Sequence, residues 1–176
     1  MPSFRAPWTT PKLLGHRDIN RHDRVARFMV KTLQFLAVIL LALSVVPGGA
    51  HLLALRNKID LPSEQYFIVQ GIYRGWALVG IVMVLALLAN AAAAVVLRRS
   101  TAAFSLSLAA TACIVAALIV FFVWTCPANQ ATSNWTVVPA NWRALRTQWE
   151  YAHAAGAVLT FAGLCCTVLS TLATPR

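Results

Sequence analysis

The sequence Asn141-Trp-Arg-Ala-Leu-Arg-Thr-Gln-Trp-Glu-Tyr-Ala-His153 runs directly into an apolar segment, residues 154–173. Wound as a helix at about 100° per residue, every third or fourth position of this stretch falls on one stripe. An ionisable group at membrane depth is expensive and usually faces protein or a cavity, so we expect this stripe to face inward. Glu150 lies at its edge, and the stripe itself comprises Trp142, Arg146, Trp149, His153, Gly156 and Thr160.

The composition is that of an integral membrane protein. Of the 176 residues, 59% are hydrophobic and only 11% are charged, whereas globular chains carry about 25% charged residues. Three apolar runs are free of charge and a fourth is interrupted only by Pro47-Gly48-Gly49; a membrane span needs about 20 apolar residues. The sequence predicts an all-α four-helix bundle, with a basic tail at 1–27, a transmembrane domain at 28–176, and spans near 32–55, 76–97, 102–125 and 151–173.

The distribution of charge predicts the topology. The net charge is +10, and seven of the fifteen basic residues precede the first span. This bias is what the positive-inside rule and attraction to anionic lipid headgroups produce, so it does not indicate a nucleic-acid partner. We expect both termini in the cytoplasm, the structured loops 56–74 and 125–150 outside, membrane lipids as partners, and a multi-pass location in a bacterial inner membrane. The basic residues are Arg5, Lys12, Arg17, Arg21, Arg24, Arg27 and Lys31.

Two interpretations of Pro47-Gly48-Gly49 are open. Small residues after an apolar core resemble a signal-peptide cleavage site, which would remove about the first 50 residues. The long basic region before the core, and the absence of charge from Thr32 to Leu55, favour an uncleaved span that is kinked or unwound near Pro47. In that case His51 lies just past the break and turns inward, and the tail ends in a short amphipathic helix on the membrane surface.

Small and polar residues inside the spans predict close helix packing. Asn90 is expected to form an interhelical hydrogen bond, and the Ala, Ser and Thr residues of the third span let neighbouring helices approach closely. Pro127 is expected to end the third helix. The four cysteines lack the spacing of a metal or redox motif and are interpreted as small packing residues: Cys113, Cys126, Cys165 and Cys166.

Two histidines are predicted to meet near the outer membrane boundary. His51 lies five residues before Arg56, and His153 lies three after Glu150, so both occupy a similar depth. The first and last helices of an up-down bundle are neighbours. The two imidazoles could ligate one metal or haem iron, or form an acid–base pair. Alternatively, each imidazole bonds a carbonyl or the headgroup region, and the tryptophans form an interfacial belt.

Four sequence elements together resemble the anthrone-oxygenase-like family of small four-helix membrane proteins, most of them bacterial and uncharacterised. The resemblance covers residues 33–173, and some fungal relatives are associated with oxidising anthrones to anthraquinones. It therefore implies an oxygenase, without implying a settled cofactor. The elements are His51-Leu-Leu-Ala-Leu-Arg-Asn-Lys58, Tyr73-Arg-Gly-Trp76, Pro127-Ala-Asn129 with Asn134-Trp135, and Trp142-x-x-Leu-Arg146-x-x-Trp149-Glu150-x-x-His153.

The first functional hypothesis is a membrane-embedded oxygenase or oxidoreductase acting on a lipophilic aromatic substrate, anthrone- or quinol-like, from the outer leaflet. His51 and His153 would be acid–base groups or metal ligands, with Glu150 beside them, and Arg146 would orient an oxyanion. Deprotonating an anthrone-like carbon gives a carbanion that O₂ can attack, so both a cofactor-free site and a metal or haem site are open. The predicted substrate-binding residues are Asn57, Tyr73, Trp76, Trp135, Trp142 and Trp149.

The second hypothesis is a non-catalytic membrane subunit or small-molecule-binding protein, whose outer loops contact a partner. The alanine run at residues 91–94 and the small residues of the third span favour helix association under either hypothesis. A homo-oligomer and a larger membrane complex are both compatible with this pattern.

Overall fold

The computed structural model describes the backbone of residues 12–174 and the side chains of Arg21 and residues 24–174. All regular secondary structure in this part of the chain is helical. The four long helices are α1 (Lys12–Lys58), α3 (Val79–Leu97), α4 (Thr101–Val120) and α6 (Trp142–Ala173). Shorter elements connect them at one end: α2 (Ser63–Gln70), the 3₁₀ turns η1 (Gly71–Tyr73) and η2 (Trp76–Leu78), the π-helical turn η3 (Phe121–Thr125) and α5 (Cys126–Ala131).

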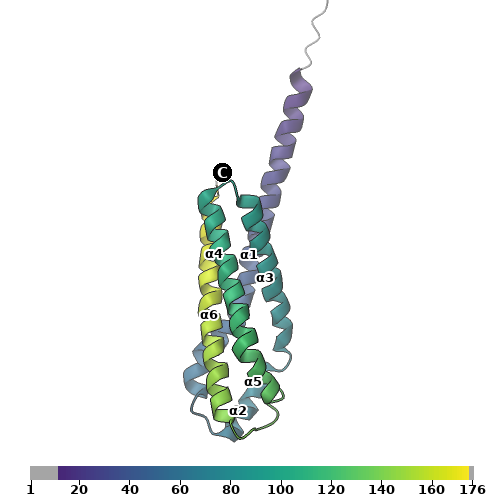
Figure 1. Cartoon of the computed structure of the whole chain (residues 1–176). Helices are drawn as coiled ribbons and strands as arrows, with labels where there is room; N and C mark the ends of the chain where they lie inside the picture. Colours follow the sequence, from purple (N-terminus) through teal and green to yellow (C-terminus); the bar gives the residue numbers. More distant parts are fainter. Residues whose placement is uncertain (1–11, 175–176) are drawn as a thin grey trace, which may run out of the picture.

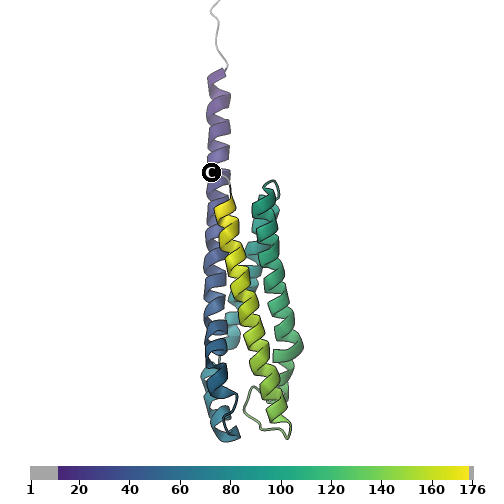
Figure 2. The ribbon, with the colours of Figure 1, turned by 90° about the vertical axis from the view of Figure 1, so that its left-hand side faces the viewer.

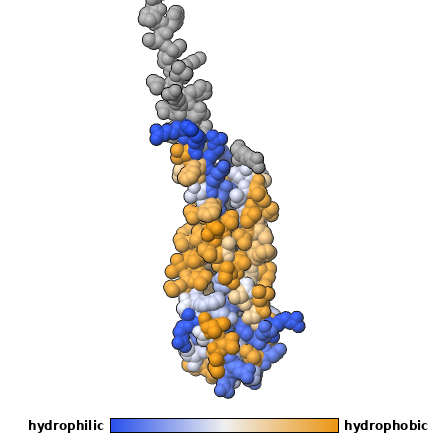
Figure 3. Space-filling model, turned by 180° about the vertical axis from the view of Figure 1, so that it is seen from behind, coloured by the Kyte–Doolittle hydropathy of each residue, from blue (hydrophilic) through white to orange (hydrophobic). Residues whose placement is uncertain are grey.

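The long helices form an up-down bundle in which α1 and α6 are neighbours, as the sequence predicts (Figure 1). Contacts run from α1 to α3, from α3 to α4, from α4 to α6 and back to α1. A broad apolar belt covers the middle of the bundle, with hydrophilic residues toward both ends (Figure 3). Four helical segments are long and apolar enough to cross a membrane, which supports a multi-pass membrane protein: Arg24–Lys58, Trp76–Leu97, Thr101–Ala131 and Trp142–Ala173.

The expected unwinding of the first span near Pro47 is wrong, because α1 runs through Pro47 as one helix. The following glycine serves helix packing instead of a turn. A Cβ atom added to Gly48 would lie 3.3 Å from both Cα and Cβ of Ala157, so the missing side chain lets α1 approach α6 closely. The expected inward orientation of His51 is confirmed, since its side chain is buried at 6% exposure.

The helix α1 is also longer at its start than expected. It is continuous from Lys12, so residues 12–31 belong to the same helix as the first span instead of forming a separate surface helix. This part of α1 projects beyond the bundle (Figures 1 and 2). The first eleven residues of the predicted basic tail lie outside the described residues.

Pro127 does not end the third span, which corrects a second expectation. In the π-helical turn η3 the Cys126 N–H donates to the Phe121 carbonyl, five residues back. This wider turn precedes Pro127, which then occupies the first turn of α5, where a helix has no need of the proline N–H. The helical path therefore continues to Ala131.

Buried polar side chains connect the long helices at membrane depth. The Thr167 hydroxyl donates to Asn90 Oδ1 at 2.7 Å, joining α6 to α3, which confirms the interhelical bond predicted for Asn90. Ser107 and Ser170 share a hydrogen bond of 2.8 Å between α4 and α6. All four cysteines are free, in keeping with a packing role.

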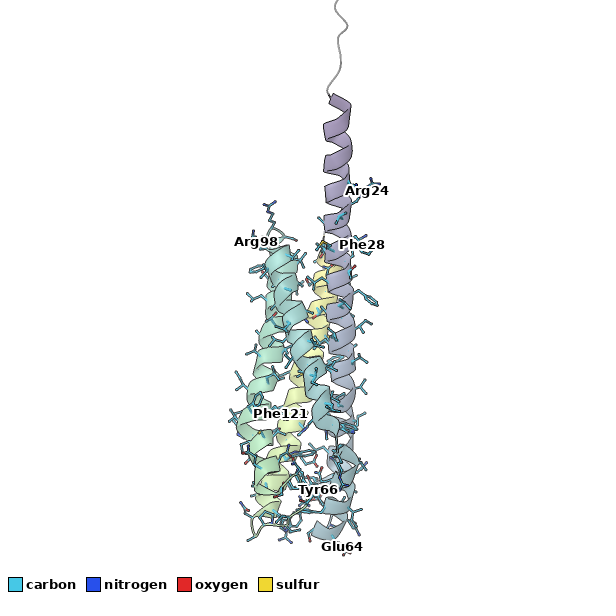
Figure 4. All side chains as sticks on the ribbon, turned by 90° about the vertical axis from the view of Figure 1, so that its right-hand side faces the viewer. Arg24, Phe28, Glu64, Tyr66, Arg98 and Phe121 are labelled. Atoms are coloured by element: carbon cyan, nitrogen blue, oxygen red, sulfur yellow. The ribbon has the colours of Figure 1, made fainter. Side chains whose placement is uncertain are left out.

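We expect the end of the bundle that carries α2 to face outward. Arg24 and Arg98 lie toward one end, and Glu64 and Tyr66 lie at the other (Figure 4). In a variant without the native cysteines, Glu64→Cys should react with an impermeant maleimide on intact cells. The matched Arg99→Cys variant should react only after permeabilisation, because basic loops stay inside. Both positions are exposed. Labelling of Arg99→Cys alone in intact cells would reverse the predicted orientation.

Candidate functional site

The predicted stripe of α6 faces the interior of the bundle. Trp142, Trp149 and Thr160 are buried, and the remaining members of the stripe are half-buried. Its outer part lies where the last turns of α1, the first turns of α6 and the short elements converge. Tyr66 of α2 points into this space (Figure 4).

The structure brings the two histidines into direct contact. The ring centroids of His51 and His153 are 4.2 Å apart, with their planes at 51°. His153 Nδ1 lies 3.0 Å from the Trp149 carbonyl. A carbonyl only accepts, so Nδ1 carries the hydrogen and Nε2 has the lone pair when the ring is neutral. His51 Nδ1 is buried and has no hydrogen-bond partner among the described residues.

Aromatic side chains enclose the histidine pair. The His51 ring centroid lies 4.3 Å from that of Tyr73, 4.9 Å from Trp149 and 5.7 Å from Trp76. Trp149 also contacts His153, at 4.0 Å between centroids. Trp76 is the outermost of these rings, at 36% exposure. Three predicted substrate-binding residues thus contact the pair directly.

The arrangement does not fit a metal or haem iron held between the two rings. Imidazoles sharing a tetrahedral ion at metal–nitrogen distances of about 2 Å would have centroids about 5 Å apart, and axial haem ligands would be farther apart still. The observed 4.2 Å is shorter than either arrangement requires. No group of three or more His, Cys, Asp or Glu side chains converges within the described residues.

A buried ion pair lies beside the histidines. Lys58 Nζ is 3.0 Å from Glu150 Oε1, and both side chains are almost fully buried. Glu150 Oε1 also accepts a hydrogen bond of 2.9 Å from the Tyr66 hydroxyl, which in turn accepts one from Gln70 Nε2. Burial and the neighbouring Glu150 carboxylate raise the pKa of the Tyr66 phenol, so it remains a donor.

Lys58 connects this ion pair to the histidine pair. Its Nζ donates to the Tyr73 hydroxyl at 3.0 Å and lies 4.8 Å from the centroid of the Tyr73 ring. It also lies 5.1 Å from the centroid of the Trp149 ring. Both rings contact His51. The charge of Lys58 is therefore held by one carboxylate and two aromatic faces.

Arg146 is engaged by its own chain. Its guanidinium donates to the Leu61 carbonyl at 2.7 Å. It also lies 4.8 Å from the Trp142 ring centroid and 5.5 Å from that of Tyr66. These contacts fasten the α1–α2 connection to α6. The Nε atom of Arg146 is the part that remains buried and without a partner.

The other predicted binding residues divide into two groups. Trp135 and Trp142 belong to the buried aromatic cluster around Tyr66, and Trp135 lies 5.7 Å from Trp149 between ring centroids. Asn57 is exposed while the next residue, Lys58, is buried. The structure therefore does not bring Asn57 to the histidines.

Asn129 holds two of the indoles with a single atom. Its Oδ1 accepts hydrogen bonds from Trp149 Nε1 at 2.8 Å and Trp135 Nε1 at 3.1 Å. The loop that carries Trp135 has left-handed backbone at three consecutive residues, Ser133, Asn134 and Trp135, with φ of 47°, 56° and 63°. Such backbone is unfavourable outside glycine, so the packing of Trp135 sustains the local strain.

Sequence reasoning missed the site roles of Lys58, Tyr66, Gln70 and Asn129. Lys58 follows His51 by seven residues, two helical turns, so the two share a face of α1. Tyr66 and Gln70 are spaced by four residues in the same way. These spacings place residues on one face, but they do not identify the partner across the bundle. Nothing local to Asn129 marks it as an acceptor for two indoles.

Comparison of the chain with protein-family models, curated proteins and solved structures finds no match.

Proposed function

We propose that the chain is a membrane-embedded oxygenase of the anthrone-oxygenase-like kind, acting on a lipophilic aromatic substrate at the outer membrane boundary. The observation that carries the proposal is the His51–His153 contact inside an aromatic enclosure, with His51 Nδ1 buried and unpartnered. Burying a polar group without a partner is costly. A substrate proton donor would supply the missing partner.

The proposed reaction begins with proton transfer from the substrate to His51. The substrate is an anthrone-like ring system whose methylene group is acidified by the neighbouring carbonyl and arenes. Removing one methylene proton gives a delocalised carbanion, which transfers electrons to O₂ and forms a carbon–oxygen bond. The resulting peroxide anion takes up a proton to become a hydroperoxide. Loss of the second methylene hydrogen, with cleavage of the O–O bond, leaves a ketone and releases water. O₂ is the only oxidant, and one O₂ is consumed for each ketone and water formed.

The surrounding residues have separate roles in this proposal. Tyr73, Trp76 and Trp149 offer aromatic faces for a planar substrate, at positions where they already contact His51. His153 assists proton transfer to His51 by packing against the His51 ring. The Nδ1 hydrogen of His153 is held by the Trp149 carbonyl. Lys58 fixes the position of Tyr73 by donating a hydrogen bond to its hydroxyl, and Glu150 in turn holds Lys58 through the ion pair.

An oxygen-consumption assay tests the proposal. The protein in lipid nanodiscs is incubated with anthrone and ¹⁸O₂, and anthraquinone and oxygen uptake are measured against empty nanodiscs. We expect a rate above the uncatalysed oxidation, equal amounts of O₂ consumed and anthraquinone formed, and one labelled oxygen in the new carbonyl. A rate equal to that of empty nanodiscs contradicts the oxygenase proposal. An absorption spectrum and metal analysis of the same sample report any bound cofactor.

The packing of the rings favours one alternative, a non-catalytic membrane subunit or binding protein. The centroids of Tyr73, Trp76, Trp149 and the two histidines lie between 4.0 and 5.8 Å from their neighbours. Rings packed this closely can stabilise the contact between the helix ends without taking part in catalysis. Under this alternative the anthrone assay gives no turnover, while substitutions of the rings lower stability.

A further inference from the structure

A surface groove lies between α1 and α6, at the end of the bundle opposite the histidine pair. Its volume is about 340 Å³. The residues that line it come from positions 31–38 of α1 and 168–172 of α6. The two helices run side by side there, and α1 continues alone past the end of α6 (Figures 1 and 2). The groove therefore ends at the base of the projecting part of α1.

The groove is polar at one end and apolar along the rest of its length. Lys31 lies four residues before Phe35 and seven before Val38, so the three share one face of α1 over a rise of about 10 Å. Lys31 is the nearest of them to the projecting part of α1. Phe35 and Leu172 are exposed, so the apolar part opens toward the hydrocarbon of the bilayer. The apolar lining residues are Phe35, Val38, Val168 and Leu172.

Two side chains at the polar end can donate hydrogen bonds to an anion. Lys31 is exposed, and its ammonium has three N–H donors. Gln34 is buried and donates one amide hydrogen to Thr174 Oγ1 at 2.6 Å. The same Nε2 atom has a second hydrogen. The Thr171 hydroxyl donates to the Thr167 carbonyl within α6. Lys31 and Gln34 are therefore the donors that the lining residues offer to a ligand.

The charges around the groove favour an anion. Arg27 lies one helical turn before Lys31 on the same face of α1. Arg98 lies toward this end of the bundle, and Glu64 lies at the other (Figure 4). Residues 24–174 contain three acidic side chains, and all three belong to the outer end, so none of them competes for Lys31. These are Asp60, Glu64 and Glu150.

We propose that this groove binds an anionic phospholipid of the cytoplasmic leaflet, whose phosphate contacts Lys31 and Gln34 and whose acyl chain follows the apolar lining residues. Basic pockets between membrane helices on the cytoplasmic side bind anionic headgroups. A soluble phosphate would leave the apolar length of the groove uncovered. A zwitterionic lipid would bring an ammonium group close to Lys31 and Arg27. The inference goes beyond the proposed function, and no step of the proposed oxidation depends on it.

The test compares phosphatidylglycerol with phosphatidylcholine of the same acyl chains. Binding of each lipid to the detergent-solubilised full chain is measured by native mass spectrometry. We expect the wild-type protein to prefer phosphatidylglycerol. Lys31→Gln should weaken phosphatidylglycerol binding about 5-fold, the equivalent of about 1 kcal/mol for one basic residue at an anionic surface, and should leave phosphatidylcholine binding unchanged. Arg98→Gln removes the same charge at the same end, outside the groove, and should bind like the wild type.

A second matched pair of variants tests the apolar part. Val168→Trp should fill the groove and abolish the preference for phosphatidylglycerol. Leu169→Trp adds the same side chain at the next position of α6, which is exposed and outside the groove, and should bind like the wild type. Equal binding by the two variants overturns the groove. Equal affinity of the wild type for both lipids, or equal weakening by Lys31→Gln and Arg98→Gln, overturns it even if Val168→Trp fails to fold.

Two further readouts identify the ligand as a lipid bound to the folded protein. Phosphatidylglycerol binding should persist in excess inorganic phosphate, and displacement by phosphate would assign the site to a soluble anion instead. A ligand that binds only the folded state raises the temperature of unfolding. Phosphatidylglycerol should therefore raise the Tm of the wild type and of Leu169→Trp by more than that of Lys31→Gln. Equal rises in all three proteins contradict the site.

Discussion

Glu150→Gln is expected to lower the free energy of unfolding by about 3–5 kcal/mol, the effect of removing one partner from a buried ion pair. Glutamine preserves the shape of the side chain but leaves the Lys58 ammonium without a counter-charge in a site where both side chains are almost fully buried. The measurement is unfolding of the detergent-solubilised protein followed by tryptophan fluorescence. Glu64→Gln makes the same chemical change at an exposed position of α2 and should stay within about 0.5 kcal/mol of the wild type.

The double variant Lys58→Met with Glu150→Leu completes the test. Replacing both charges by apolar side chains removes the uncompensated charge, so most of the lost stability should return. A double variant as unstable as Glu150→Gln would show that the hydrogen bonds from Tyr66 and Lys58, not the charge pairing, determine stability here.

His51→Ala and His153→Ala are each expected to reduce anthrone turnover by about 10²–10⁴-fold, the range for loss of a general acid or base. The rings are in contact, so they should act as one unit, and the double variant should lose little more than either single variant. The measurement is initial O₂ consumption in nanodiscs. Gln130→Ala, an exposed change on α5, serves as the control. Folded histidine variants with wild-type turnover would reduce the pair to a structural contact.

Much of the fold could be predicted from the sequence because the apolar runs of a membrane chain leave few alternatives. The segment Trp76–Leu97 and the inward stripe of α6 follow from hydropathy and helical period alone. Continuity of α1 through Pro47 does not follow from them. The close contact of Gly48 with Ala157 shows that this glycine serves helix packing, whereas the local sequence predicts a break.

The candidate site could be predicted in part, because helical periodicity and depth in the membrane indicate which residues face inward at the same level. Periodicity placed His153 and Trp149 on an inward face, and matched depth brought His51 to the same level. Pairing across helices requires knowledge of which faces meet. The Lys58–Glu150 ion pair and the acceptor role of Asn129 depend on that arrangement, so they become visible only once the bundle is assembled.

The contact between Gly48 and Ala157 acts as a spacer for the candidate site. Gly48 lies one helical turn from His51 on α1, and Ala157 lies one turn from His153 on α6. The distance between α1 and α6 near the two imidazoles is therefore set by atoms that cannot change rotamer. The separation of the two imidazole rings is in turn set by how closely α1 packs against α6 at Gly48 and Ala157.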